Sequence, residues 1–494
     1  MGITEEKAKG RFYTPEHIVR SILNLSGYRG PEILRKHVID NSCGDGAFLK
    51  EIVKRYCSEA IGAGYTKSEL ASELGQYIHG IEIDEGEKNK AVEHIAEIAR
   101  SFGADNVRWD VEQCDTLTET RFDGKMDFVL GNPPYVRVHH LADTYDTIKR
   151  FRFSQNGMTD IFIVFYEIGL NMLKAGGTLG YITPSSLFNS KAACELRRHF
   201  VNKNLIRAVV DLKHYQPFEA TTYTTIMILE KDPDRQTARE QLIDYYEYDS
   251  LKQIENFVCG LTCDDFYIGG DFYFASKRKL AQLARILNCQ KKYPGIDVKN
   301  GFATLLDSFF IGDWPFDEYV IPVVKGSTGK STKCLFPYDR NGKLIPYNQL
   351  EKNKLISAHY HNYETKLRGR SLASGDEWYG FGRTQGILDV YKRKYSICPI
   401  IKTLKDLKIT LCDKGTGVYG GLYILTDYDK QTVEEILLTE DFMEYISLLG
   451  KYKSGGYYTF SSKDLKRYIC FKLSERRNFK DEQLRLFECS ESFV

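Results

Sequence analysis

The stretch VIDNSCGDGAFLKEIV, residues 38–53, predicts a short strand, a glycine turn and an amphipathic helix in direct succession. This order is the first half of a βαβ unit. Gly44 and Gly46 would let the backbone approach a ligand closely, and Asp40 ends the strand. The third glycine of a dinucleotide fingerprint is absent, and a carboxylate here suits an amino or sulfonium group better than a pyrophosphate. Taken alone, the segment fits a turn without a ligand equally well.

The same alternation of strands and helices continues over the first 230 residues. Six apolar, β-branched runs predict strands: 37–40, 77–84, 126–132, 177–184, 206–212 and 224–230. Helix-like segments between most of them predict an α/β fold with a mostly parallel sheet, whose site lies at the carboxyl ends of the strands. The polar segment 230–240 is interpreted as a surface excursion that ends this first unit.

Composition indicates a soluble globular protein, since 42% of the 494 residues are hydrophobic and 27% are charged. The apolar runs are too short for a membrane span, and the charged N-terminus does not resemble a secretory signal, so a cytoplasmic protein without membrane contact is expected. The 12 cysteines lack the paired spacing of zinc ligands, and no metal site is predicted.

Charge is distributed unevenly although the net charge is +1. Residues 1–270 contain 32 Lys and Arg against 40 Asp and Glu, a net charge of −8, whereas residues 271–494 contain 36 against 27, a net charge of +9. We therefore expect a catalytic domain over 1–270, a linker helix over 271–290, and a basic, loop-rich α+β domain over 291–494 that approaches a polyanion. Uneven solvated surfaces are the alternative.

Acidic residues also follow the next predicted strands. Glu82 ends the second strand, where a carboxylate can accept hydrogen bonds from both hydroxyls of a ribose, and Ile83 could pack on an adenine face. Asp115 could accept from an adenine amino group. Asp110 competes for that role, but Asp115 is preferred because it lies 12 residues before Asp127, which leaves room for the next strand. Solvated acids at strand ends remain an alternative.

The segment DFVLGNPPYVR, residues 127–137, ends another predicted strand at the same edge. Its two prolines fix φ and lack N–H donors, so that backbone carbonyls project from the turn. Tyr135 adds a flat apolar face. The Asn132 side-chain oxygen and the Pro133 carbonyl could accept both N–H groups of a planar amine and restore its nucleophilicity toward a methyl group about 3 Å away. A rigid turn without a ligand is the alternative.

In chain order, the segments GRFYTP, DNSCGDGAFL, GIEID, CDTL and GNPPY resemble the S-adenosylmethionine-dependent adenine methyltransferases of bacterial restriction-modification systems. The order is similar to the gamma type, with cofactor motifs first and the recognition domain last. The resemblance implies a Rossmann-like catalytic domain that transfers a methyl group to N6 of adenine in a short duplex DNA sequence, with the base flipped out. In the first segment, Thr14 is expected to cap a helix, with Pro15 in its first turn.

The resemblance assigns roles to individual residues. Catalysis is assigned to the turn itself: Asn132, Pro133, Pro134 and Tyr135. Thr14 would contact the methionine end of the S-adenosyl-L-methionine cofactor, Asp40 its amino group, Glu82 its ribose and Asp115 its adenine. The remaining cofactor contacts are expected from Cys43, Gly44, Gly46, Ile83, Asn132, Asp160 and Phe165. Tyr135 would stack on the flipped base, and Phe188 is the nearest candidate for the opposite wall.

The C-terminal half resembles the target-recognition domains of these enzymes through WYGFGRTQ, GVYGGLYIL and KSGGYYTFSSKDLKRY. Six cations are candidates for phosphate contacts: Arg368, Arg370, Arg383, Lys451, Lys453 and Lys463. We expect a monomer that binds double-stranded DNA, with cleavage left to a separate cognate endonuclease. Three alternatives stay open: methylation of an RNA base, methylation of a protein glutamine amide, and a catalytically inactive DNA-binding protein.

Overall fold

The computed structural model describes residues 13–136, 145–155, 159–218, 222–234, 241–293 and 295–491, with side chains in the last helix described up to residue 476. The chain divides into two compact units, Met1–Ala284 and Arg285–Val494, which are considered separately below. None of the helices in the described ranges is long and apolar enough to cross a membrane.

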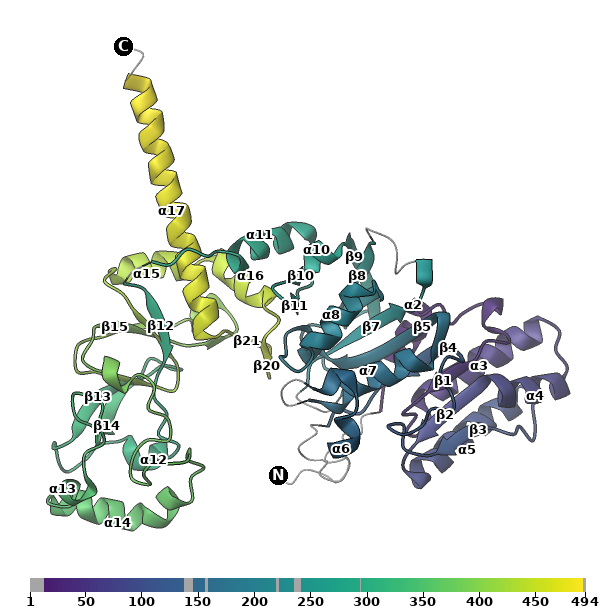
Figure 1. Ribbon diagram of the computed structural model, residues 1–494, viewed down its shortest axis with the longest axis horizontal. Coiled ribbons are helices and arrows are strands. Elements are labelled where there is room, and N and C mark those ends of the chain that lie inside the picture. The colour runs from purple at the N-terminus through teal and green to yellow at the C-terminus, as the bar shows by residue number, and fades with distance from the viewer. Residues whose placement is uncertain are drawn as a thin grey trace. The chain divides into compact units, whose positions relative to one another are not determined.

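Unit 1 is built on a nine-stranded sheet with the order β3-β2-β1-β4-β5-β7-β6-β8-β9 (Figure 1). Its strands are β1 (Val38–Asp40), β2 (Ile78–Glu82), β3 (Asp110–Gln113), β4 (Met126–Gly131), β5 (Leu173–Pro184), β6 (Ile206–Asp211), β7 (Thr224–Glu230), β8 (Ile243–Asp249) and β9 (Ile254–Leu261). The strands from β3 to β5 are parallel neighbours, and β7 runs antiparallel to both β5 and β6. β8 is parallel to β6, and β9 closes the sheet antiparallel to β8.

Helices cover both faces of the sheet because successive strand residues, which point to opposite faces, are apolar on each side. The longer helices of unit 1 are α2 (Glu16–Leu25), α3 (Ala47–Gly62), α4 (Lys67–Tyr77), α5 (Glu85–Ser101), α7 (Ile161–Met172), α8 (Cys194–Asn202) and α11 (Lys277–Leu287), the last of which crosses the boundary between the units. Leu130 and Ile182 share one core with residues of α2, α3 and α5. On the other face Tyr181 packs against Tyr166 of α7, so both faces are buried, as a parallel sheet requires.

All six predicted strands are present, as β1, β2, β4, β5, β6 and β7. The sequence did not reveal β3, a four-residue edge strand that is only partly buried. The interpretation of 230–240 as the end of the first unit is wrong, because β8 and β9 extend the same sheet beyond it. Ile243, Tyr245 and Tyr248, the buried residues of β8, supply the apolar surface for this extension.

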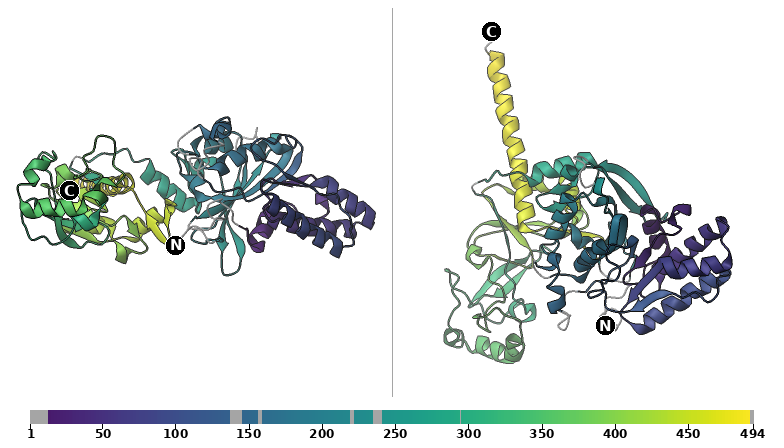
Figure 2. Two further views of the ribbon diagram at one scale, coloured as in Figure 1. Left: turned by 90° about the horizontal axis from the view of Figure 1, so that it is seen from below. Right: turned by 45° about the vertical axis from the view of Figure 1, so that its right-hand side comes forward.

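Unit 2 has the expected α+β character. Three small sheets carry its strands, in the orders β12-β19-β15-β17, β14-β13-β18 and β16-β21-β20. The strands are β12 (Asp297–Asn300), β13 (Val320–Lys325), β14 (Ser331–Leu335), β15 (Lys394–Ile397), β16 (Ile400–Ile401), β17 (Ile409–Cys412), β18 (Gly417–Tyr419), β19 (Leu422–Leu425), β20 (Tyr452–Lys453) and β21 (Tyr457–Thr459). The longer helices are α14 (Lys354–Arg368), α15 (Lys430–Leu437), α16 (Glu440–Leu448) and the terminal α17 (Ser462–Glu491), drawn in yellow in Figure 2.

Candidate active site

The carboxyl ends of β2, β1 and β4 meet at one edge of the sheet because these strands are adjacent and parallel. Hydrogen bonds join their end residues. The Gly44 N–H donates to Glu82 Oε2 at 2.9 Å, and Ser42 Oγ donates to the Asn132 carbonyl at 3.3 Å. The glycine turn, the acid of β2 and the NPPY turn, far apart in the sequence, therefore form one site.

Asp40 lies at the centre of this edge and is only 1% exposed. Its Oδ1 accepts a hydrogen bond from the Ser42 N–H at 3.1 Å. Burial raises the pKa of Asp40 to about 8, and the nearby carboxylates of Glu82 and Asp45 add to the rise although the Ser42 bond opposes it. Gly131 makes this position possible, because a Cβ there would lie 2.6 Å from Asp40 Oδ1. A bound cation would favour the ionised form of this carboxyl.

The turn after β1 has the backbone geometry that its glycines predict. Gly44 and Gly46 have φ values of +52° and +90°, and Gly46 is the N-cap of α3. The Cys43 N–H donates to the Ile81 carbonyl at 2.9 Å, which ties the turn to β2. Burial raises the pKa of the Cys43 thiol well above its usual value, so Cys43 contributes its backbone to the site and keeps a neutral side chain.

Glu82 is held from two sides and is 9% exposed. Its Oε1 accepts from the Asp84 N–H at 3.0 Å, while Oε2 accepts from Gly44. The neighbouring Ile83 is an apolar side chain that is 63% exposed. An oriented carboxylate beside an exposed aliphatic surface fits a nucleoside, with hydroxyls on the acid and the base on the apolar face.

Replacing Glu82 with alanine should raise the dissociation constant of a nucleoside cofactor about 10- to 100-fold, because hydrogen bonds to a charged group are worth roughly 1.5–3 kcal/mol. Isothermal titration calorimetry measures this change. Glu93→Ala is the matched control, since Glu93 is exposed on α5. An unchanged affinity in a folded Glu82→Ala protein would exclude the ribose contact.

Of Asp110 and Asp115, the two candidates for the adenine contact, only Asp115 lies at the edge of the sheet that carries the site. The Cys114 N–H donates to the Glu82 carbonyl at 3.2 Å, which holds the turn containing Asp115 against β2. Asp115 Oδ1 accepts from the Leu117 N–H at 2.9 Å. Asp110 begins β3 at the opposite edge, where its oxygens contact His79 at 2.6 Å and Arg121 at 2.9 Å.

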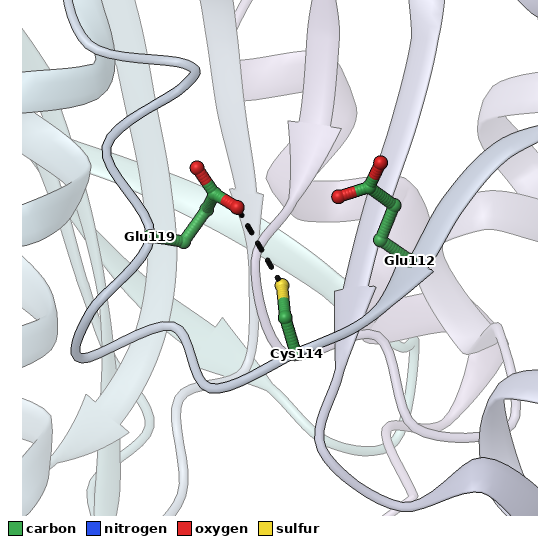
Figure 3. Close-up of side chains that lie close together, drawn as sticks. All are labelled: Glu112, Cys114 and Glu119. Carbon is green, nitrogen blue, oxygen red and sulfur yellow. Dashed lines mark hydrogen bonds between the residues drawn. The ribbon is translucent and has the colours of Figure 1, made fainter.

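Three half-buried side chains near this turn offer metal-ligand atoms within 4.8 Å of one another: Glu112, Cys114 and Glu119. Figure 3 shows the Cys114 thiol turned toward Glu119, with which it makes a 3.8 Å contact. Glu112 pairs with Arg121 at 2.8 Å. Burial, with help from the two glutamates, raises the pKa of Cys114 to about 11, and a protonated thiol is a poor ligand. The expected lack of a metal site stays a prediction.

The NPPY turn follows β4, and its first side chain is held by Thr14. Asn132 Nδ2 donates to Thr14 Oγ1 at 3.1 Å. This contact corrects the expected cap: the N-cap of α2 is Pro15 and makes no side-chain bond, because Thr14 lies one residue too early and directs its hydroxyl to Asn132. Because the Asn132 side-chain nitrogen is bonded to Thr14, the side-chain oxygen of Asn132 points away from Thr14. Pro133 is buried and Pro134 is half-buried.

Tyr135 is fixed by its hydroxyl, which donates to the Ile182 carbonyl at 3.1 Å. Burial raises the pKa of this tyrosine well above its usual value, so it stays neutral. Its ring lies edge-on to Phe218, with centroids 6.1 Å apart. Phe188, the expected partner, packs instead on Phe274 at 4.9 Å. The sequence analysis missed Phe218, although an aromatic residue shortly after the predicted strand 206–212 was a usable signal.

Two further predicted residues belong to α7. The Ile161 N–H donates to the Val136 carbonyl at 3.0 Å, which places Asp160, the N-cap residue of α7, beside the NPPY turn. Phe165 lies one turn further along the helix and is buried. Asp160 is thus brought to the site by a backbone contact, and the cofactor contact of the buried Phe165 stays a prediction.

Two of the six candidate phosphate contacts in unit 2 have internal roles. Arg370 donates to the carbonyls of Thr304 and Trp378 at 2.5 and 2.6 Å. Lys451 pairs with the buried Asp464 at 2.6 Å. Arg370 is thus bonded to backbone carbonyls and Lys451 to a carboxylate, and a phosphate contact by either residue stays a prediction. The other four candidates are exposed: Arg368, Arg383, Lys453 and Lys463.

The sequence is similar to those of known methylases and methyltransferases. Residues 50–218 match the family of the Eco57I restriction-modification methylase. The type II methyltransferase M.BstVI of Geobacillus stearothermophilus is 25% identical over 423 residues, which cover 75% of this chain and 73% of the relative. The type II methyltransferase M.XhoI of Xanthomonas vasicola is 22% identical, with 93% of this chain and 90% of the relative covered.

The fold also has a counterpart among solved structures. The type IIL restriction-modification enzyme MmeI, solved in complex with DNA, aligns with a TM-score of 0.60 and 15% identity. The alignment covers 90% of this chain, which spans 64% of the MmeI chain. Unit 1, with its mostly parallel sheet and covering helices, accordingly has the Rossmann-like α/β fold of methyltransferases.

Proposed function

We propose that this restriction-modification methyltransferase, whose cofactor is S-adenosyl-L-methionine, methylates N6 of an adenine in a short duplex DNA sequence. The observation that carries the proposal is the position of the Asn132–Pro133 turn, joined by Ser42 to the turn that begins at Asp40. An amine acceptor site and a cation site adjoin each other there, as transfer of a methyl group between two bound molecules requires.

The residues at the strand ends fit the cofactor. The buried Asp40 carboxyl suits its amino group, the oriented Glu82 carboxylate suits the ribose hydroxyls, and the exposed Ile83 suits the adenine face. Asp115 stands at the adjacent turn, within reach of the adenine amino group by our assignment. Once bound, the cofactor supplies an electrophilic methyl group on a sulfonium.

The NPPY turn then acts on the target base. The Asn132 side-chain oxygen and the Pro133 carbonyl accept the two N–H groups of the adenine amine, which draws its lone pair out of conjugation with the ring. Tyr135 offers its ring face to the flipped base, and Phe218 stands edge-on beside it. Acceptors aimed in advance at developing positive charge lower the barrier without reorganisation during the reaction.

A nucleic-acid substrate is favoured over a protein glutamine by the second unit, and DNA is favoured over RNA by the similarity to a restriction-modification methylase family. Residues 271–494 have a net charge of +9 and contain exposed cations among tyrosines, which suits contact with a phosphate backbone. An enzyme for a small amide substrate has no evident need for such a domain. We propose that the protein acts on DNA in the bacterial cytoplasm as a monomer, paired with a separate endonuclease.

The deciding experiment is expression in a host without adenine methylation, followed by single-molecule sequencing of its genome. Methyladenine at every copy of one short motif would establish reaction, substrate and specificity. An unmodified genome in cells that contain folded, cofactor-binding protein would refute the DNA substrate and direct attention to RNA or protein.

Tyr135→Ala should weaken capture of the target base because the stacking face is lost. Base–aromatic stacking is worth roughly 1–3 kcal/mol, so affinity for DNA with 2-aminopurine at the target position should fall about 5- to 100-fold, with a smaller fluorescence increase. Tyr135→Phe, which loses only the bond to Ile182, is the control and should keep most of the signal. An undiminished fluorescence change in Tyr135→Ala would argue against stacking.

A further inference from the structure

A short polar loop of unit 2, Arg383 to Gln385, is exposed to solvent although its backbone is firmly held. Arg383 exchanges two backbone hydrogen bonds with Ala303: its N–H donates at 2.9 Å, and its carbonyl accepts at 3.1 Å. The side chains of Arg383, Thr384 and Gln385 all remain exposed. Three adjacent hydrogen-bonding side chains thus stand on an immobilised backbone.

The chain that leads into the loop is held by Arg370. Its guanidinium donates to the carbonyls of Thr304, Trp378 and Gly380, at 2.5, 2.6 and 2.9 Å. Burial lowers the pKa of Arg370. The three contacts of this half-buried guanidinium fix the path of residues 378–380 against the segment that contains Ala303.

The chain that leaves the loop is held by a buried acid. Asp389 accepts hydrogen bonds at 2.8 Å from Lys299 and from Tyr423, and it pairs with Lys392 at 2.8 Å. Burial alone would raise the pKa of Asp389, but these three donors lower it to about 2. Gly386 permits the approach of Tyr423, because a Cβ at Gly386 would lie 2.9 Å from the Tyr423 hydroxyl.

A buried lysine also contacts this segment. Lys394 is 1% exposed, and its Nζ donates to the carbonyls of Asp389, Val390 and Lys392, at 2.7, 3.2 and 3.0 Å. Burial lowers the pKa of Lys394 to about 8. The half-buried Arg370 before the tripeptide and the buried Asp389 and Lys394 after it therefore hold both flanks. Burying the last two charges costs desolvation, which their contacts offset.

We propose that the Arg383–Gln385 loop contacts base edges in the DNA duplex and determines part of the recognition sequence. This inference rests on the proposed DNA methylation. Arginine forms bidentate hydrogen bonds with O6 and N7 of guanine, and glutamine forms them with N6 and N7 of adenine. A bidentate base contact has strict geometry, and a backbone ordered in advance lowers the cost of making it. Phosphate contacts position a protein on the duplex without specifying sequence. The rigid flanks favour the first use.

The test compares Arg383→Ala and Gln385→Ala with the wild-type enzyme on duplexes in which each base pair of the methylated motif is changed in turn. For each enzyme, the ratio of kcat/KM on the original motif to kcat/KM on a duplex with one changed base pair measures discrimination at that base pair. In each variant this ratio should fall about tenfold or more at a single base pair and keep its wild-type value at the others. Genome sequencing from cells that express each variant should then show a motif degenerate at that position. Arg340→Ala is the control, because it removes another exposed guanidinium of unit 2.

The outcomes separate the two proposals. A wild-type enzyme that leaves DNA unmodified refutes the proposed function. A wild-type enzyme that methylates one motif, with loop variants that keep the motif and lose rate equally on every sequence, refutes only the base contacts and assigns the loop to phosphate. Unchanged rate and motif in both variants also overturn the inference. Because the substituted side chains are exposed, melting temperatures near the wild-type value are expected.

Discussion

Asn132→Ala should lower the rate of methyl transfer about 10²- to 10³-fold while the cofactor dissociation constant changes little. The substitution removes one of the two proposed acceptors of the target amine. It also removes the 3.1 Å bond to Thr14, which orients the amide. Cofactor affinity should persist because Asp40, Glu82 and Asp115 are held by bonds in which the Asn132 side chain takes no part.

Single-turnover transfer of a labelled methyl group measures this loss independently of product release, and calorimetry with S-adenosylhomocysteine measures cofactor-site binding. Asn24→Ala, an equivalent truncation at an exposed position of α2, is the control. A folded Asn132→Ala enzyme that retained half of the wild-type single-turnover rate would remove the NPPY turn from the mechanism.

Asp40→Asn should weaken cofactor binding strongly at pH 8 and abolish its pH dependence. In the cofactor-free protein burial raises the pKa of Asp40 to about 8, so the carboxyl is largely protonated at pH 6 and must ionise to pair with the cofactor's amino group. Wild-type affinity should therefore rise by about tenfold per pH unit from pH 6 toward pH 8 and fall at higher pH, where the cofactor's own amino group loses its proton. The asparagine variant should bind weakly and equally across this range.

The same substitution should change stability in the opposite sense. Because the pKa of Asp40 in the folded state is raised above its ordinary value of 3.8, the folded state binds more protons than the unfolded state. The contribution of Asp40 to stability therefore falls as pH rises from about 4 to about 8. Relative to the wild type, cofactor-free Asp40→Asn should gain melting temperature over that interval.

Asp105→Asn, which changes an exposed acid on the same unit, is the control and should change neither the cofactor affinity nor the melting temperature. Equal affinities and pH profiles for wild type and Asp40→Asn would exclude the amino-group contact.

Local sequence signals located six of the nine strands in the main sheet of unit 1. Strands such as 177–184 and 206–212 were found because each is a compact apolar run, and parallel order brought Asp40, Glu82 and Asn132 to one edge. β3 was not predicted because its alternation of apolar and polar residues is weak over four residues. The continuation of the sheet into β8 was not predicted because a polar segment precedes that strand.

The sequence by itself determined the α/β fold class, the order of the motifs and the strand ends at which they lie, because strand periodicity and turn chemistry are properties of neighbouring residues. Only the tertiary structure decided which side chains are committed to internal contacts. Thr14 binds Asn132 across 118 positions, and Arg370 binds the Thr304 carbonyl across 66. Phe218, not Phe188, stands beside Tyr135. Such pairings depend on how distant segments pack, and a residue's type and immediate neighbours do not specify them.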